Sequence, residues 1–279
     1  MGVGLDRESV EQGMNLLLAN ALRACVVVLW AACPARSGPA GEEWRSQRLA
    51  MVESQIESRG VSNPRVLEAM RTVARHLFVP ESVRAMAYAD HPLPIGEGQT
   101  ISQPYIVAVM TELLDPQPED KVLEVGTGSG YQAAVLSGLA RHVYTIEIVP
   151  SLAQRAEKTL QANGYDNVTV ITGDGYRGLP DVAPFDGIIV TAAPDEVPGP
   201  LLEQLAIGGR MVIPVGTIDQ ELRVIERTEK GFETKSVLPV RFVPMTGEAR
   251  KKPPKGSGLD SHTSRSGLLV VAEASLESR

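Results

Sequence analysis

The sequence predicts a doubly wound α/β fold, in which helices cover both faces of a mostly parallel sheet. Apolar runs typical of buried strands alternate with segments of helical periodicity from Lys121 to Val215. Such alternation indicates βαβ units with right-handed crossovers. A glycine-rich loop, residues 126–130, follows the first apolar run and precedes the first of these helices. Because ligands of such sheets bind beyond the carboxyl ends of the strands, the loop marks a candidate cofactor crevice.

Five strands are expected to be parallel and two late strands antiparallel. The parallel strands are expected over residues 122–125, 143–147, 168–172, 185–191 and 210–215. One helix is expected directly after the glycine loop, and two more over residues 151–163 and 200–205. The two late strands, over residues 222–226 and 237–243, are expected to pair antiparallel at the edge of the sheet.

Three helices are expected before the first strand. The first covers residues 44–59 and stops at Gly60, the second begins at Pro64, and the third covers residues 103–114. Between the second and the third, the density of Pro and Gly in residues 92–98 indicates an ordered loop. These segments must pack over the open crevice or the edge of the sheet.

The glycine spacing distinguishes between cofactors. A dinucleotide site requires G-x-G-x-x-G, but Tyr131 stands where the third glycine of that pattern would lie. One acidic residue, Glu124, lies in the strand before the loop, and another, Glu147, ends the next apolar run, where a carboxylate can accept hydrogen bonds from a ribose diol. Together these features favour S-adenosylmethionine, which has a ribose and no phosphate. A structural turn without a ligand and a nicotinamide dehydrogenase are the alternatives.

The composition argues against several other classes of function. The chain has 279 residues, a formal net charge of −7 and no dense basic face, so nucleic acid is not expected as the main partner. Only 4% of the residues are aromatic, which leaves no platform for stacking bases. The only cysteines, Cys25 and Cys33, precede the main body, and the four histidines are scattered. We therefore expect no disulfide framework and no metal.

The two ends of the chain differ from its middle. Residues 1–41 are expected to be a leader or an unstructured extension, residues 42–246 one domain, and residues 247–279 a flexible tail rich in Gly, Ser, Pro and charge. The apolar run of residues 24–32 has the length of a signal-peptide core, but no positively charged segment precedes it. Export, a lipid anchor near Cys33 and a mis-assigned start are the possible explanations, and membrane contact is expected only with a real anchor.

Several blocks of the sequence resemble the protein-L-isoaspartate O-methyltransferase family. The resemblance covers Arg45 to Met245, and its most restrictive blocks contain TISQP and GGRMVIPVG. Its blocks are LPIGEGQTISQP (93–104), VLEVGTGSGYQAAVLS (122–137), VYTIE (143–147), GDGYRGLP (173–180) and PFDGIIVTAA with LLEQLAIGGRMVIPVG (184–216).

The family resemblance implies a Rossmann-like methyltransferase fold and methyl transfer from S-adenosylmethionine to the free α-carboxyl of L-isoaspartyl residues in aged peptides and proteins. The methyl ester then leaves through a succinimide, which starts repair. Because the cofactor is made inside cells, a cytoplasmic location is expected, with export or lipid anchoring through the leader as the alternative.

The resemblance also assigns the site. Ser102 is expected to be the catalytic residue, and the turn from Ile101 to Gln103 is expected to position the substrate carboxylate. Ser102 is also expected to cap the following helix. Ala192 is expected to line the pocket. The expected cofactor-binding residues are Glu124, Gly126, Thr127, Gly128, Gly130, Glu147, Asp174, Gly175 and Thr191.

The chemistry requires no histidine base. The α-carboxyl has a reference pKa of roughly 3.3 to 3.7, so it is already the nucleophile at neutral pH. The protein has to align the reacting groups and exclude water. Two alternatives remain open: a methyltransferase for a small-molecule carboxylate or hydroxyl, and a catalytically silent protein that binds isoaspartyl residues.

Overall fold

The structure is a computed structural model that describes residues 39–250. Its contacts divide the chain between Gln47 and Arg48, and helix α2 (Pro39–Met51) begins in the first of the two units. The described part of that first unit is helical and includes an exposed ion pair between Arg45 and Glu42. The expected leader, apart from residues 39–41, and residues 251–279 of the expected tail lie outside the described residues. The fold below is that of the second unit.

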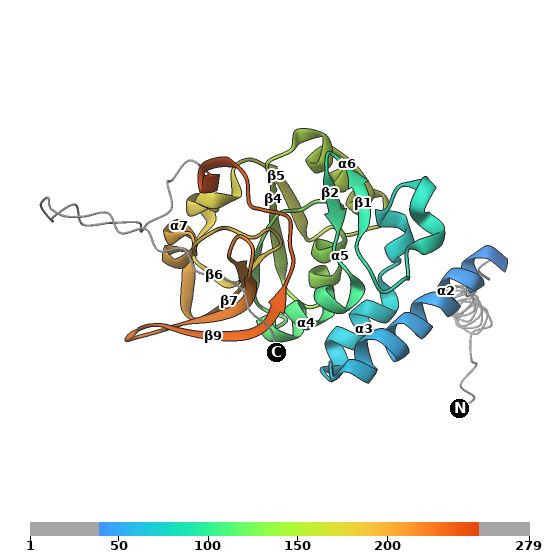
Figure 1. Cartoon of the computed structure of the whole chain (residues 1–279), viewed down its shortest axis with the longest axis horizontal. Helices are drawn as coiled ribbons and strands as arrows, with labels where there is room; N and C mark the ends of the chain where they lie inside the picture. The colour runs from blue at the N-terminus through green and yellow to red at the C-terminus, as the bar shows by residue number, and fades with distance from the viewer. Residues whose placement is uncertain (1–38, 251–279) are drawn as a thin grey trace, which may run out of the picture. The chain divides into compact units, whose positions relative to one another are not determined.

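A seven-stranded sheet in the order β5-β4-β3-β6-β7-β8-β9 forms the centre of this unit (Figure 1). The first five strands in that order are parallel, and β8 and β9 pair antiparallel at one edge, so the predicted fold class is confirmed. The strands are β3 (Lys121–Val125), β4 (His142–Glu147), β5 (Val168–Thr172), β6 (Phe185–Val190), β7 (Leu205–Val215), β8 (Gln220–Thr228) and β9 (Gly231–Val240).

Alternation along the strands gives the sheet two apolar faces. Leu123, Ile188 and Met211 belong to a buried cluster that also contains Leu201 of helix α7 (Gly199–Glu203). The opposite face is covered by α4 (Pro104–Leu114), whose Leu114 side chain lies against Gly187 of β6, and by α5 (Tyr131–Ser137). Figure 1 shows α7 on one side of the sheet and α4 and α5 on the other.

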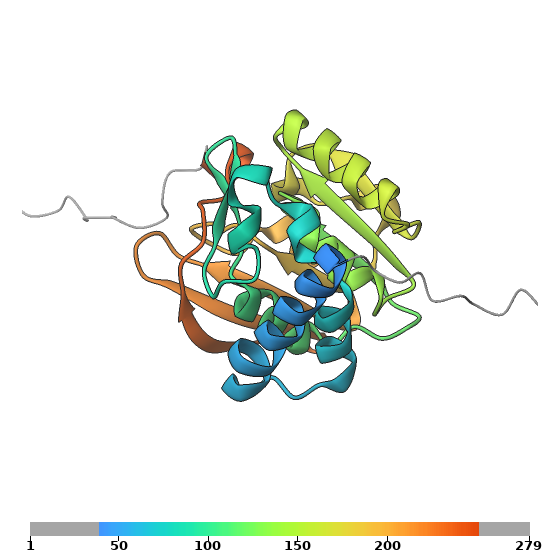
Figure 2. The same cartoon turned by 90° about the vertical axis from the view of Figure 1, so that its right-hand side faces the viewer.

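The remaining predicted helices are present, with boundaries set by their end residues. Helix α3 (Pro64–Thr72) begins after Asn63, whose side chain accepts a hydrogen bond from the Arg65 amide at 3.0 Å. Helix α6 (Pro150–Ala162) buries Leu152, Ala153, Ala156 and Leu160. Figure 2 shows α6 beside the strands it follows.

The predicted helix over residues 44–59 is helical throughout but not regular. After α2 it continues as a π-helical turn, η1 (Val52–Ile56), and a 3₁₀ turn, η2 (Glu57–Arg59). It ends at Gly60, which has a φ of 96°, so the predicted stop is confirmed. Among residues 39–250, no helix is long and apolar enough to cross a membrane.

The segment 92–98, predicted as an ordered loop, is instead part of a β-hairpin. Strands β1 (Leu93–Gly96) and β2 (Gln99–Ile101) form an antiparallel hairpin, with Leu93 opposite Ile101. Its turn places Glu97 and Gly98 at positive φ, as tight hairpin turns require. The alternation of buried and exposed residues in β1 is only four residues long, and its Pro and Gly obscured it.

Candidate functional site

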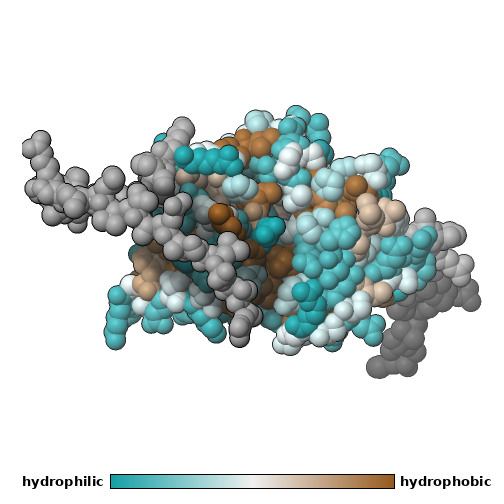
Figure 3. All heavy atoms as spheres, in the orientation of Figure 1, coloured by the Kyte–Doolittle hydropathy of each residue, from teal (hydrophilic) through white to brown (hydrophobic). Residues whose placement is uncertain are grey.

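Two adjoining pockets lie at the carboxyl ends of β3, β4 and β6. Including their open mouths, the larger pocket has a volume of about 620 Å³ and the smaller one about 330 Å³. Four residues line both of them: Thr100, Gly126, Gly128 and Thr191. The space-filling view of Figure 3 shows hydrophobic and hydrophilic residues side by side around the middle of the visible face. The two pockets therefore share a wall built mainly from the glycine loop.

The glycine loop is shaped by its conformation and by its neighbours. Gly126, Gly128 and Gly130 all have positive φ, which L side chains rarely adopt. A Cβ at Gly126 would also collide with the hydroxyl of Thr191, which donates to the Gly126 carbonyl at 2.6 Å. Gly126 and Gly128 are therefore needed where the backbone forms the pocket wall.

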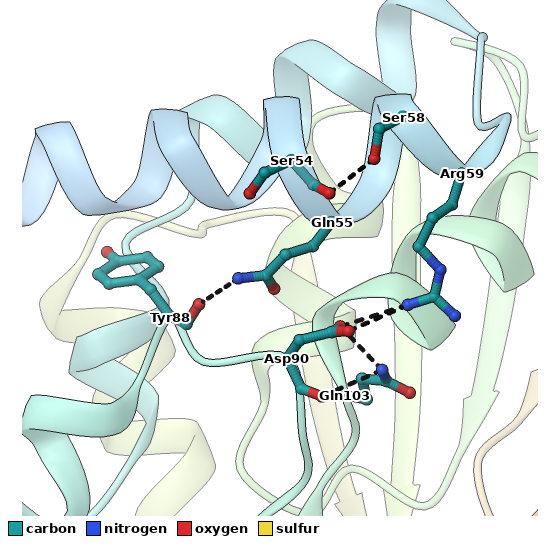
Figure 4. A network of polar contacts seen from close by, with 7 residues as sticks. All are labelled: Ser54, Gln55, Ser58, Arg59, Tyr88, Asp90 and Gln103. Carbon is teal, nitrogen blue, oxygen red and sulfur yellow. Dashed lines mark hydrogen bonds and ion pairs between the residues drawn. The ribbon is translucent and has the colours of Figure 1, made fainter.

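Gly130 and Gln103 were predicted as site residues but line neither pocket. Gly130 precedes α5, and a Cβ there would meet Leu160 of α6 at 3.2 Å, so this glycine allows close packing of helices. The Gln103 side chain turns to Asp90 and donates to its carboxylate at 2.8 Å. Figure 4 shows that Asp90 also accepts from Arg59, so Gln103 belongs to a polar network beside the site.

Glu147 is fixed at the rim of the larger pocket. It ends β4, is 6% exposed, and accepts hydrogen bonds from the Gly128 amide at 2.8 Å and the Val149 amide at 3.0 Å. The two bonds go to different carboxylate oxygens, and each oxygen retains a further lone pair. The carboxylate is thus oriented by the backbone while it can still accept hydrogen bonds from hydroxyl groups of a ligand.

Asp174 and Gly175, which follow β5, also line the larger pocket, as does Ala192, which follows β6. The Asp174 carboxylate accepts from the Tyr176 amide at 3.0 Å and from the Glu248 amide at 2.8 Å. A Cβ on Gly175 would collide with the side chain of Val125, so only glycine fits there without a shift. The turn after β5 is thereby held to β3 and to the end of the described chain.

A wall that was not predicted completes the larger pocket. Residues 243–246 line it, and the backbone of this segment pairs with Ala193, whose amide donates to the Val243 carbonyl at 2.8 Å. The Met245 amide donates back to Ala193 at 2.7 Å. The chain then forms the short turn η7 (Gly247–Arg250), where Glu248 also pairs with Arg177. A run of four apolar or proline residues, 242–245, was the only signal for this wall in the sequence.

The smaller pocket brings Ser102, Ile101, Glu124 and Thr127 together. The predicted helix cap is wrong: Gln103 precedes the first residue of α4, and no side chain caps that helix. Within residues 39–250, the Ser102 hydroxyl forms no hydrogen bond, whereas its carbonyl accepts from Arg75 at 2.7 Å. The hydroxyl remains able to bind a ligand.

Glu124 lies behind the glycine loop and is fully buried. One of its oxygens accepts from the Thr145 hydroxyl at 2.6 Å, and that hydroxyl also contacts the Thr127 hydroxyl at 2.6 Å. The other oxygen, Oε1, has no hydrogen-bond partner among the described residues. Burial raises the pKa of the Glu124 carboxyl to about 8; the Thr145 hydrogen bond opposes this rise and the nearby Glu147 adds to it. The carboxyl is therefore mainly protonated at neutral pH.

Sequence reasoning did not single out Gln132 or Arg75 as residues of this region. Gln132 lines the smaller pocket and donates to Thr111 at 2.9 Å, and Arg75 lies behind Ser102. Neither of them belongs to a spacing pattern. Over the part of the chain that the structure describes, no group of three or more His, Cys, Asp or Glu side chains is placed to hold a metal ion.

Comparison with known proteins gives consistent similarities. A family model described as protein-L-isoaspartate(D-aspartate) O-methyltransferase matches residues 46–250. A protein-L-isoaspartate O-methyltransferase of Gloeobacter violaceus is 56% identical over 200 residues, which are 71% of this chain and 98% of the relative. One from a Picosynechococcus species is 54% identical over 202 residues, 72% of this chain and 91% of the relative.

Solved structures have the same fold. A structure described as protein-L-isoaspartate O-methyltransferase is 28% identical, with a TM-score of 0.67, over 74% of this chain and 67% of that one. A Plasmodium falciparum protein, solved in complex with S-adenosyl-L-homocysteine, is 24% identical with a TM-score of 0.64, over 71% of this chain and 98% of that one.

Proposed function

Because the chain belongs to the protein-L-isoaspartate(D-aspartate) O-methyltransferase family, we propose that its two adjoining pockets hold the two reactants of that family's reaction. The enzyme transfers a methyl group from S-adenosylmethionine to the free α-carboxyl of L-isoaspartyl residues in peptides and proteins, which initiates repair through a succinimide. The larger pocket is the proposed cofactor site and the smaller one the proposed acceptor site. The observation that carries this assignment is the wall of Gly126, Gly128 and Thr191 that the two pockets share.

The residues of the larger pocket fit S-adenosylmethionine. The backbone at Gly126 and Gly128 leaves space that side chains would fill, and the oriented carboxylate of Glu147 suits a ribose diol. We propose that Asp174 and Gly175 receive the adenine. When bound, the cofactor supplies a methyl group on a positively charged sulfonium. The protein has to hold this group against the shared wall and keep water away from it.

In the smaller pocket, the proposed role of Ser102 is to donate a hydrogen bond to the α-carboxylate. The free hydroxyl supports this role, and so does the start of α4, where backbone amides carry partial positive charge. The network of Gln103, Asp90 and Arg59 holds the same turn from its other side (Figure 4).

The protonation of Glu124 suits an anionic substrate. An ionised carboxylate in the lining of the smaller pocket would repel the α-carboxylate. Because burial keeps the Glu124 carboxyl mainly neutral at pH 7, the pocket avoids that repulsion. The substrate carboxylate is itself ionised and needs no general base, which agrees with a pocket that no histidine lines among the described residues.

The proposed function is tested with two peptides that differ only in an L-isoaspartyl or a normal aspartyl linkage, each incubated with methyl-labelled S-adenosylmethionine. Only the isoaspartyl peptide should be labelled. Equal labelling of the two peptides, or labelling of small carboxylic acids or alcohols in their place, would contradict it. Tight cofactor binding without turnover on any isoaspartyl peptide would indicate a silent binding protein.

Two variants test the assignment of the pockets. Ser102→Ala should lower kcat at least about 100-fold, because a positioning hydrogen bond is lost, while cofactor affinity stays within about threefold. Glu147→Ala should weaken cofactor binding at least about tenfold. The reverse pattern, with Ser102→Ala weakening cofactor binding and Glu147→Ala leaving it unchanged, would refute the assignment.

We further propose that the enzyme is cytoplasmic, because its cofactor is made inside cells, and that nucleic acid is not a partner, since the net charge is −7. Determining the mature N-terminus from native cells tests the location. Cleavage before Cys33 or near Ala40 would overturn it in favour of export or lipid anchoring. The family match to residue 250 and the bond from Glu248 to Asp174 support a domain that extends to about residue 250.

A further inference from the structure

A fully buried arginine lies directly behind the proposed acceptor site. Arg75 begins the 3₁₀ turn η3 (Arg75–Phe78) and is 0% exposed. Its guanidinium donates to the carbonyl of Ala87 at 2.8 Å and to that of Ser102 at 2.7 Å. Its central carbon lies 4.9 Å from the centre of the Tyr131 ring. Ser102 and Tyr131 both line the smaller pocket, so Arg75 contacts two residues of its wall.

The charge of Arg75 is not balanced by any carboxylate within residues 39–250. No ion pair involves this side chain there, and its Nη1 has no hydrogen-bond partner in the same range. Burial lowers the pKa of the guanidinium to about 10, so it stays protonated at neutral pH. Since an unpaired buried charge is costly, such a group is usually retained beside a counter-charge.

We propose that Arg75 is an electrostatic residue of the acceptor site: from behind Ser102 and Tyr131 it supplies the positive charge that selects an anionic α-carboxylate. This inference rests on the proposed function of the smaller pocket. Among the described residues, that pocket is lined by no lysine, arginine or histidine. Besides the partial charge of the α4 amides, a full positive charge is available from behind the lining, where Arg75 contacts Ser102 and Tyr131.

A charge placed behind the wall suits the chemistry. A guanidinium in direct, bidentate contact would withdraw electron density from both carboxylate oxygens and make them weaker nucleophiles. The carboxylate also loses its negative charge during transfer, so a remote positive charge stabilises the bound substrate more than the transition state. Removing the charge should therefore raise KM without lowering kcat.

The test compares Arg75→Met with Arg65→Met. Arg65 also donates to two backbone carbonyls, of Pro116 and Leu139, but lines neither site pocket. Calorimetry with S-adenosylhomocysteine present measures the affinity for an L-isoaspartyl peptide and for the same peptide with an α-carboxamide. Wild type and Arg65→Met should prefer the carboxylate, and Arg75→Met should reduce that preference about tenfold. Its KM should rise about tenfold, with no loss of kcat and with unchanged affinity for S-adenosylhomocysteine.

If Arg75→Met lowers the affinity for both peptides equally, or lowers the affinity for S-adenosylhomocysteine, the proposal is overturned in favour of a purely structural role for Arg75. If Arg75→Met does not fold, Arg75→Lys at pH 6 retains the charge. Arg75→Lys should keep the preference for the carboxylate peptide within about threefold of wild type. Loss of that preference in a folded Arg75→Lys variant would also overturn the proposal. If the wild-type enzyme fails to methylate the isoaspartyl peptide, the proposed function is refuted. If wild type is active and Arg75→Met has the same carboxylate preference and KM as wild type, only this inference is refuted.

Discussion

Replacing Glu124 with glutamine should make the protein progressively more stable than wild type as the pH rises from 5 to 8. Glutamine has nearly the same shape and can still accept the hydrogen bond from Thr145, but it cannot ionise. In wild type, burial raises the pKa of the Glu124 carboxyl from 4.5 to about 8. The folded state therefore keeps a proton that the unfolded chain releases over this range.

The sign follows from proton binding. Between pH 4.5 and 8 the folded state binds more protons than the unfolded state, so the free energy of unfolding of wild type falls as the pH rises. A difference of about 3.5 pH units corresponds to at most about 5 kcal/mol. At pH 5 the ionisation of Glu124 should change the free energy of unfolding by less than about 1 kcal/mol. By pH 8 the free energy of unfolding of the variant should exceed that of wild type by about 2 to 5 kcal/mol more than it does at pH 5.

Urea unfolding without cofactor at pH 5, 6, 7 and 8 measures these differences. Other titrating groups are the same in the two proteins, so the difference between their free energies of unfolding isolates Glu124. Glu157→Gln, the same substitution at an exposed position of α6, is the matched control and should follow wild type at every pH. A difference between wild type and Glu124→Gln that is the same at pH 5 and pH 8 would refute a neutral buried carboxyl.

Two further predictions concern the walls of the larger pocket. Gly126→Ala should destabilise the fold by about 1 to 3 kcal/mol and weaken S-adenosylmethionine binding, because the added Cβ collides with Thr191. Thermal unfolding measures the stability and calorimetry measures the binding. The control is Gly98→Ala, which also lies at positive φ but has no atom within 4 Å of the added Cβ. A chain ending at residue 242 should bind S-adenosylmethionine at least about tenfold more weakly than one ending at residue 250. The shorter chain lacks residues 243–246 and the Glu248 amide, which donates a hydrogen bond to the Asp174 carboxylate. Equal affinities of these two chains would show that the C-terminal wall does not contribute.

The parts of the fold that local periodicity encodes were predicted from the sequence. The strand over residues 168–172 has the predicted bounds, and Pro64 and Gly60 mark helix ends through properties of single residues. The Ser102 cap failed because α4 begins one residue later than a cap at that position requires, with Pro104 at its first position.

The features that were missed depend on contacts between distant segments. The pairing of Val243 with Ala193 is made by backbone atoms, which carry no residue signature. The burial of Arg75 results from the packing of η3 against α5 and the segment before α4, so a single arginine in the sequence could not indicate it. Likewise, the glycine pattern located Glu124, but only its tertiary environment shows that it carries a proton.

The wall that the two pockets share also bears on how the reactants affect each other's binding. Gly126, Gly128 and Thr191 line both pockets, and the Thr191 hydroxyl already ties this wall together by donating to the Gly126 carbonyl at 2.6 Å. A reactant that shifts the wall from one pocket changes the surface that the other reactant meets. By thermodynamic linkage, the factor by which S-adenosylhomocysteine changes the affinity for an isoaspartyl peptide must equal the factor by which that peptide changes the affinity for S-adenosylhomocysteine.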